Sequence, residues 1–133
     1  MAISLDKLMG FHHKALQVRT ERMEVIAGNL ANANTPGYKA RDINFQDAMK
    51  NARHSRDQNL TRTHENHIQG HTKGNGEIEF RMPNQPDTGD GNTVDVQIER
   101  NNFLDNGLRY QAGMEFINGK IKGMKKAISG GQG

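Results

Sequence analysis

The sequence has no cysteine and no tryptophan among its 133 residues, and only three prolines. Without cysteine, neither a disulfide framework nor a thiolate metal site can form. No stretch approaches the ~20 consecutive apolar residues of a transmembrane helix, so we expect no membrane span. The opening residues, "MAISLDKLMGFHHKAL", hold neither the apolar segment nor the cleavage site of a secretory signal. Sec-dependent export is therefore not expected.

Apolar and aromatic residues are also scarce. Hydrophobic residues make up 33% of the chain and aromatic residues 5%, and the mean hydropathy is −0.87. Compact domains usually contain about 45–50% apolar residues with glycine included. The length suits one domain or two small ones. We expect that part of the chain is disordered, or that other chains complete its core.

The net charge of +3 permits binding to nucleic acid or to an anionic surface but does not require it. A helix-turn-helix or an aromatic platform would be needed for nucleic-acid recognition, and neither pattern is present. We therefore expect five basic residues among the first 41 positions to face solvent or to pair between subunits. They are Lys14, Arg19, Arg22, Lys39 and Arg41. A small basic helical module that binds nucleic acid or an anionic surface is the alternative function.

The N-terminal segment predicts a long helix that ends near Ala33. Ser4 is a suitable N-cap, and Asp6 in the first turn complements the helix dipole. Apolar residues then recur at alternating spacings of four and three, which is typical of a coiled-coil seam. This N-terminal seam comprises Leu5, Met9, Leu16, Met23, Ile26 and Leu30, with His12 and Arg19 as polar interruptions.

The C-terminal segment predicts a longer helix, capped by Asp95 or Thr93, with the same periodicity. Its C-terminal seam comprises Phe103, Tyr110, Met114, Ile117, Ile121, Met124 and Ile128. Four glycines inside this helix cost roughly 1 kcal/mol each relative to alanine, which predicts close neighbours on several sides. Two seams this long indicate that the end helices pack on each other and on further copies of the chain.

The middle of the chain is polar and weakly patterned. A short helix is predicted over Phe45–Ala52, and "EIEFRMP" at 77–83 alternates like a short strand. The rest of 39–76 has the composition of a loop, and "NQPDTGDGNT" has the composition of a turn.

No pattern in the chain predicts catalysis, a cofactor or a metal ion. His64, His67 and His71 could share a helix face, but no helix is predicted there and no carboxylate completes a ligand set. "DTGDGN" at 87–92 resembles the start of a calcium loop, yet the closing position holds Ile98 instead of glutamate. A metal-dependent enzyme is accordingly the third reading, behind a structural protein and a binding module.

The stretch "NLANANTPGY" at 29–38 predicts a helix that stops at a turn. Pro36 and Gly37 suit the central positions of a type II turn, and Thr35 is driven out of helical conformation because it precedes proline. These residues account for the stop but not for the asparagines. Asn29 and Asn32 share one helix face, where amides become useful if they meet a neighbouring helix; a C-terminal cap by asparagine is the simpler possibility.

Two stretches resemble the family of bacterial flagellar rod and hook proteins. "NLANANTPGYKARDINFQ" is similar to the family's N-terminal signature, and "DGNTVD" is similar to its start of the C-terminal helix. The short chain resembles proximal rod subunits more than hook proteins. The likeness covers roughly 1–50 and 78–130.

The resemblance implies a mainly α fold whose terminal helices pack as an antiparallel coiled coil and form the core of a flagellar tube, with a small irregular or β middle segment. The expected divisions are a core helix at 1–35, an outer segment at 36–93 and a second core helix at 94–133. It also implies an assembly motif at the junction of the first two, comprising Asn29, Asn32, Thr35, Pro36, Gly37 and Tyr38.

The resemblance further implies a structural, non-enzymatic subunit of the proximal rod, in the periplasmic part of the basal body, that transmits motor torque. Its expected partners are its own copies, other rod proteins, the rod-base adaptor FliE, the MS ring and the export gate. Such subunits leave the cell unfolded through the flagellar type III apparatus. Phe45 and Met49 in "FQDAM" resemble the export-gate signal of early subunits, although a short amphipathic helix gives the same pattern.

Overall fold

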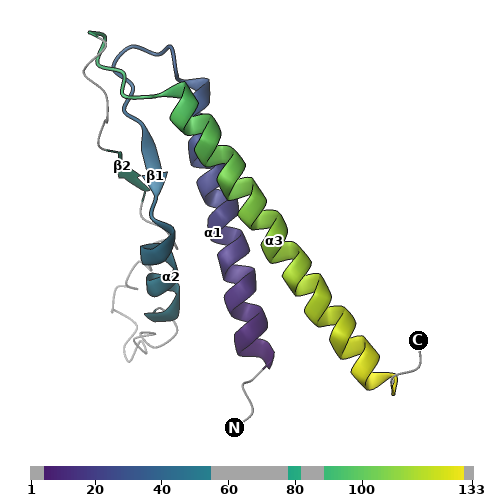
Figure 1. Ribbon diagram of the computed structural model, residues 1–133. Helices are drawn as coiled ribbons and strands as arrows, with labels where there is room; N and C mark the ends of the chain where they lie inside the picture. Colours follow the sequence, from purple (N-terminus) through teal and green to yellow (C-terminus); the bar gives the residue numbers. More distant parts are fainter. Residues whose placement is uncertain (1–4, 55–77, 82–88, 131–133) are drawn as a thin grey trace, which may run out of the picture.

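Two long helices dominate the computed structural model, which describes residues 5–54, 78–81 and 89–130. Helix α1 (Leu5–Ala31) and helix α3 (Val96–Ile128) run antiparallel and lie side by side (Figure 1). This arrangement confirms the mainly α architecture expected from the sequence. None of the helices in the described ranges is long and apolar enough to cross a membrane.

The other face of α1 carries the middle of the chain (Figure 1). Strand β1 (Arg41–Ile43) pairs antiparallel with β2 (Ile78–Phe80), and helix α2 (Phe45–His54) follows β1 directly. The expected strand and short helix are therefore confirmed. The expectation that 39–44 is a loop was wrong, because three residues are too few to show a strand's alternation in the sequence.

Helix α1 ends at Ala31, two residues before the expected Ala33. The backbone N–H groups of Asn32 and Ala33 donate to carbonyls three residues back, at 3.1 and 3.3 Å. This tighter pattern is common in the last turn of a helix. The expected N-cap, Ser4, lies outside the described residues.

Helix α3 begins with a side-chain cap from Asp95, one of the two residues expected there. Its carboxylate accepts from the backbone N–H groups of Gln97 and Ile98, at 2.9 and 3.3 Å. Thr93 has a different partner, because its hydroxyl accepts from the backbone N–H of Ala40 at 2.8 Å. The start of α3 is thereby connected to the segment that follows α1.

The buried apolar core is small and lies on the side of α1 that faces away from α3. Val18 packs with Ile43 of β1 and with Ala48 and Met49 of α2. By contrast, seven large hydrophobic residues of α3 are exposed: Phe103, Leu104, Leu108, Met114, Phe116, Ile121 and Ile128. Most of the apolar surface of α3 is thus available to other chains.

Gly113 of α3 lies close to a side chain of α1. A Cβ at this position would lie 3.1 Å from Cδ2 of Leu16, which is tighter than an ordinary contact. The other three glycines inside α3, Gly107, Gly119 and Gly123, have open space where a Cβ would be. Within this chain, only one of the four glycines therefore has the close neighbour that the sequence predicted.

Candidate functional site

The chain turns sharply after α1, at Thr35–Tyr38. Gly37 has a φ of +73°, and the backbone N–H of Tyr38 donates to the carbonyl of Thr35 at 3.2 Å. Both features match a type II turn. The turn also pairs with the segment before α3, since the N–H of Gly37 donates to the carbonyl of Asp90 at 2.8 Å. The two stretches that carry the family resemblance therefore lie side by side.

Asn92 closes the end of α1 from the other stretch. Its side chain is buried, and Nδ2 donates to the carbonyls of Asn32, Ala33 and Thr35 at 3.0, 2.9 and 2.9 Å. The amide group has two hydrogens for three acceptors, so at least one hydrogen is shared between two carbonyls. The sequence analysis gave Asn92 no role. The signal that could have indicated its role is its position in "DGNTVD", one of the two stretches that carry the family resemblance.

Asn29 connects α1 to both of its neighbours. The fully buried side chain accepts from the N–H of Arg41 at 3.0 Å and donates to the carbonyl of the same residue at 2.6 Å. It also donates to the Glu99 carboxylate at 3.1 Å and accepts from the Tyr38 hydroxyl at 3.3 Å. One amide thus binds the backbone of β1, the start of α3 and the turn.

The other two asparagines of the stretch act locally or face solvent. Asn32 donates to the carbonyl of Gly28 at 2.8 Å and accepts from the Thr35 hydroxyl at 3.1 Å. Asn34 and Pro36 are exposed. The structure therefore places a neighbouring helix beside Asn29 but not beside Asn32, which stabilises the end of its own helix.

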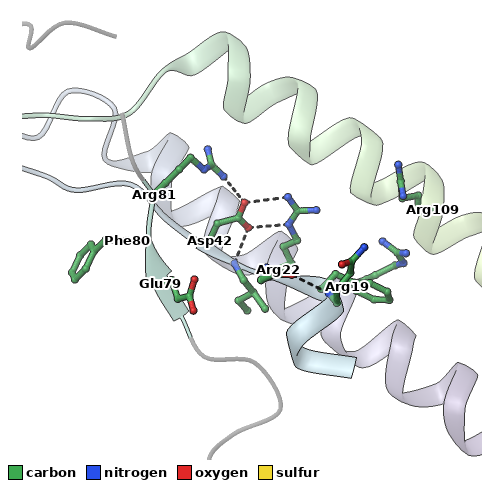
Figure 2. A pocket seen from close by; sticks show the side chains of 11 residues that line it. Arg19, Arg22, Asp42, Glu79, Phe80, Arg81 and Arg109 are labelled. Carbon is green, nitrogen blue, oxygen red and sulfur yellow. Dashed lines mark hydrogen bonds and ion pairs between the residues drawn. The ribbon is translucent and has the colours of Figure 1, made fainter. Parts of the chain in front are cut away.

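Charged side chains from α1 and from the segment after β2 converge on Asp42 of β1 (Figure 2). Arg22 of α1 binds Asp42 of β1 through two hydrogen bonds of 2.8 and 3.1 Å. Arg81, which follows β2, binds the same carboxylate at 2.7 Å and also binds Glu99 of α3. Glu99 is only 1% exposed. The cluster of Arg22, Asp42, Arg81 and Glu99, hereafter the charged junction, therefore joins both long helices to the sheet.

Pairing within the charged junction shifts the pKa of Asp42 and of Arg22 in the directions that a stable ion pair requires. Burial alone would raise the pKa of Asp42, but hydrogen bonds from Arg22 and Arg81 outweigh it and hold the pKa below its ordinary value. The hydrogen bond to Asp42 raises the pKa of Arg22. Among the described residues, every buried side-chain nitrogen or oxygen has a hydrogen-bond partner.

The contact between α1 and α3 is more polar than a coiled-coil seam. Asn106 is fully buried, and it donates to the carbonyl of Arg19 at 2.8 Å. Glu99, Asn106 and Gly113 follow one another at seven-residue spacing on the face of α3 that meets α1. The predicted C-terminal seam lies to one side of this face.

The structure buries the two predicted seams unequally. Ile26 is fully buried, and the other described side chains of the N-terminal seam are half-buried: Met9, Leu16, Met23 and Leu30. The side chain of Leu5 lies outside the description. In the C-terminal seam, three side chains are half-buried: Tyr110, Ile117 and Met124. Phe103, Met114 and Ile121 are each 38% exposed, and Ile128 is 87% exposed.

The two residues of the expected export signal lie in α2. Met49 is buried in the small core, and Phe45 is half-buried beneath the Arg19 guanidinium, whose carbon lies 4.1 Å from the ring centre. In the folded chain, these side chains hold α2 against α1.

The alternative sites gain no support from the geometry. His64, His67 and His71 lie outside the described residues, and within those residues no group of three potential ligands could hold a metal ion. Some of the five basic residues have partners within the chain. Arg22 is paired with Asp42, and the Lys39 ammonium donates to the carbonyl of Gly91 at 2.6 Å.

Comparison with known proteins agrees with the resemblance. The family model described as "Flagella basal body rod protein" matches residues 9–39. The Aeromonas hydrophila flagellar basal body rod protein FlgB is 53% identical over 132 residues, which cover 99% of this chain and 100% of that protein.

Two further relatives have the same name and match over nearly their whole length. The Escherichia coli FlgB is 43% identical over 98% of this chain and 99% of its own. The Salmonella typhimurium FlgB is 40% identical over 96% of both chains. The chain therefore belongs to the family of flagellar basal body rod proteins called FlgB, which are structural subunits of the rod.

Proposed function

We propose that this rod subunit assembles by burying the exposed apolar side of α3 against helices of neighbouring subunits. The observation that carries the proposal is the set of seven large hydrophobic side chains exposed on this one helix. Large apolar side chains exposed in this number are typical of a helix that binds other protein chains. The resulting helical tube transmits motor torque by rigid packing and needs no catalytic chemistry.

The junction between α1 and the outer segment sets the angle between the axis of α1 and the chain that follows it. Asn29 binds β1 and α3 together, while the turn at Gly37 pairs with the segment before α3. This supports the assembly motif of Asn29, Asn32, Thr35, Pro36, Gly37 and Tyr38. It also supports the division into a core helix at 1–35, an outer segment at 36–93 and a second core helix at 94–133.

We propose the partners that the family membership suggests. They are further copies of the chain, other rod proteins, the adaptor FliE, the MS ring and the export gate. The type III apparatus would export the subunit unfolded to the periplasmic rod. Phe45 and Met49 would then serve as an export signal, because a buried side chain such as Met49 is accessible only in an unfolded chain.

Complementation of a strain that lacks this subunit tests the proposal. Ile121→Asp places a carboxylate in the proposed interface, where an unpaired charge costs several kcal/mol. We expect secreted subunit but no hooks and no swimming in soft agar. Asn51→Asp puts the same carboxylate on an exposed polar position of α2, outside the proposed interface, and should swim normally. Normal hooks in the Ile121→Asp strain would contradict the proposed interface.

A further inference from the structure

An open groove of about 590 Å³ lies beside the charged junction (Figure 2). Side chains from α1, the start of α2, β2 and α3 line it. Four are arginines, Arg19, Arg22, Arg81 and Arg109, whereas only two are carboxylates, Asp42 and Glu79. We call this the arginine groove. Its lining carries a net charge of +2.

In the described part of the chain, Arg19 has no carboxylate bound to it directly; its guanidinium donates to Oδ1 of Asn106 at 3.4 Å, and the charge of Asp105 opposes the lowering of its pKa. Asp42 already pairs with Arg22 and Arg81, and within the described residues no carboxylate forms an ion pair with Arg19. Burial, together with the charges of Arg109 and Arg22, lowers the pKa of Arg19. Within the described ranges, Arg109 pairs with the exposed Asp105 one turn away, and such surface pairs contribute little.

A complementary surface lies on the far side of α3. Leu104, Leu108, Gln111 and Glu115 follow one stripe of the helix, which we call the outer stripe. It points away from α1, because Gly113, nine residues after Leu104, faces Leu16. The two leucines are 64% and 67% exposed. Glu115 is also exposed, and it makes no ion pair within the described part of the chain.

We propose that the outer stripe of one copy docks on the arginine groove of the next copy, with the Glu115 carboxylate between Arg19 and Arg109. The two surfaces match in charge, and both have apolar parts, since Phe80 at the groove is 67% exposed. This inference rests on the proposed function, because it requires that the chain assembles with copies of itself.

The proposed contact is heterologous, since two different surfaces of the chain meet. Each added copy leaves one arginine groove and one outer stripe free. Contacts of this type build open helical assemblies when the rotation between copies does not close a ring. One contact would therefore be sufficient to extend a tube.

Disulfide cross-linking tests the contact directly, because the chain has no cysteine of its own. Arg109→Cys and Glu115→Cys would be co-expressed on separate chains, and isolated basal bodies would be oxidised. We expect a cross-linked dimer only when both variants are present. Glu24→Cys, an exposed position on α1, replaces Glu115→Cys as the control and should give none. The docking is overturned if the test pair gives no cross-linked dimer, or if the control pair of Arg109→Cys and Glu24→Cys gives one while the test pair does not.

Charge reversal gives an independent readout. Glu115→Arg and Arg109→Glu should each reduce the number of hooks at least roughly tenfold, the scale of a lost interfacial charge pair. The double variant should assemble better than either single variant, whereas Glu24→Arg should assemble normally. Single reversals without effect, or a double variant without recovery, overturn the docking. If Ile121→Asp still blocks assembly in that case, only the docking fails; normal hooks with Ile121→Asp would contradict the proposed function itself.

Discussion

At the scale of single residues, the junction after α1 depends on side-chain amides that take the place of backbone groups. Asn29 pairs with both the N–H and the carbonyl of Arg41, as a neighbouring strand would. Asn92 donates to three carbonyls that the end of α1 leaves without helical partners. These contacts explain why "NLANANTPGY" contains more amides than a helix stop requires. Asn29 connects α1 to β1 and α3, whereas Asn32 stabilises the end of its own helix.

Asn92→Ala is expected to destabilise the fold by about 1–3 kcal/mol, because it removes the three hydrogen bonds that this buried side chain donates. Urea unfolding followed by circular dichroism would measure the change. Asn34→Ala removes an amide from an exposed position in the same stretch and should stay within about 0.5 kcal/mol. Equal effects of the two substitutions would show that Asn92 is not a specific cap.

The backbone conformation at position 37 favours glycine, whereas the space around it would admit a side chain. Its φ is +73°, yet no heavy atom lies within 4 Å of where a Cβ would be. Gly37→Val should therefore cost about 1–3 kcal/mol through strain alone, and the subunit should be exported but not incorporated. Gly37→Asn should be milder, because asparagine tolerates the left-handed region.

Hook counts for the Gly37 variants would separate the two explanations. If Gly37→Ala assembles normally while Gly37→Asn fails, side-chain size is the constraint and the conformational account is wrong.

At the scale of elements, the sequence predicted the long helices and the turn because strong local signals define them. Asp95 precedes a sustained periodic pattern, and Pro36-Gly37 permits few other conformations. The sequence did not predict β1, nor the second face of α1 that carries Val18, because both depend on segments far away in the chain. Periodicity also could not identify the polar contact between α1 and α3.

The charged junction was missed for the same reason. Arg22, Asp42, Arg81 and Glu99 are far apart in the sequence, and each is an ordinary surface residue by type. Only the pairing of β1 with β2 brings Arg81 between the two carboxylates. From residue type alone, such side chains are expected to be exposed to solvent. In the structure they lie where the two long helices and the sheet meet.

The charged junction should make the fold sensitive to acid. The folded-state pKa of Asp42 lies below its ordinary value of 3.8. Its contribution is therefore present above about pH 4 and is lost as the pH falls through the folded-state pKa. Asp42→Asn should lower the urea midpoint at about pH 7 and flatten its decrease toward about pH 3. Asp47→Asn, in an exposed pair with Lys50, should change neither. An unchanged acid response in Asp42→Asn would contradict the role of Asp42.

At the scale of the whole molecule, the distribution of apolar residues explains the low hydrophobic content. The buried hydrophobic residues of the described chain are few: Val18, Ile26, Ala40, Ile43, Ala48 and Met49. The large apolar side chains of α3 are mostly exposed. A chain built in this way reaches its full burial only in an assembly, so its stability depends on its neighbours.

The isolated chain should consequently be ordered unevenly. Hydrogen exchange should be slowest in the parts of α1 and α3 that meet at Asn29, Glu99 and Asn106, where side chains are buried. It should be fast over 118–128, where every residue except Met124 is exposed and a helix end with little packing is marginal in water. In assembled rods, protection should extend along the whole of α3. Uniformly slow exchange along the whole of α3 in the isolated chain would contradict this account, because the exposed apolar surface would then not need a partner.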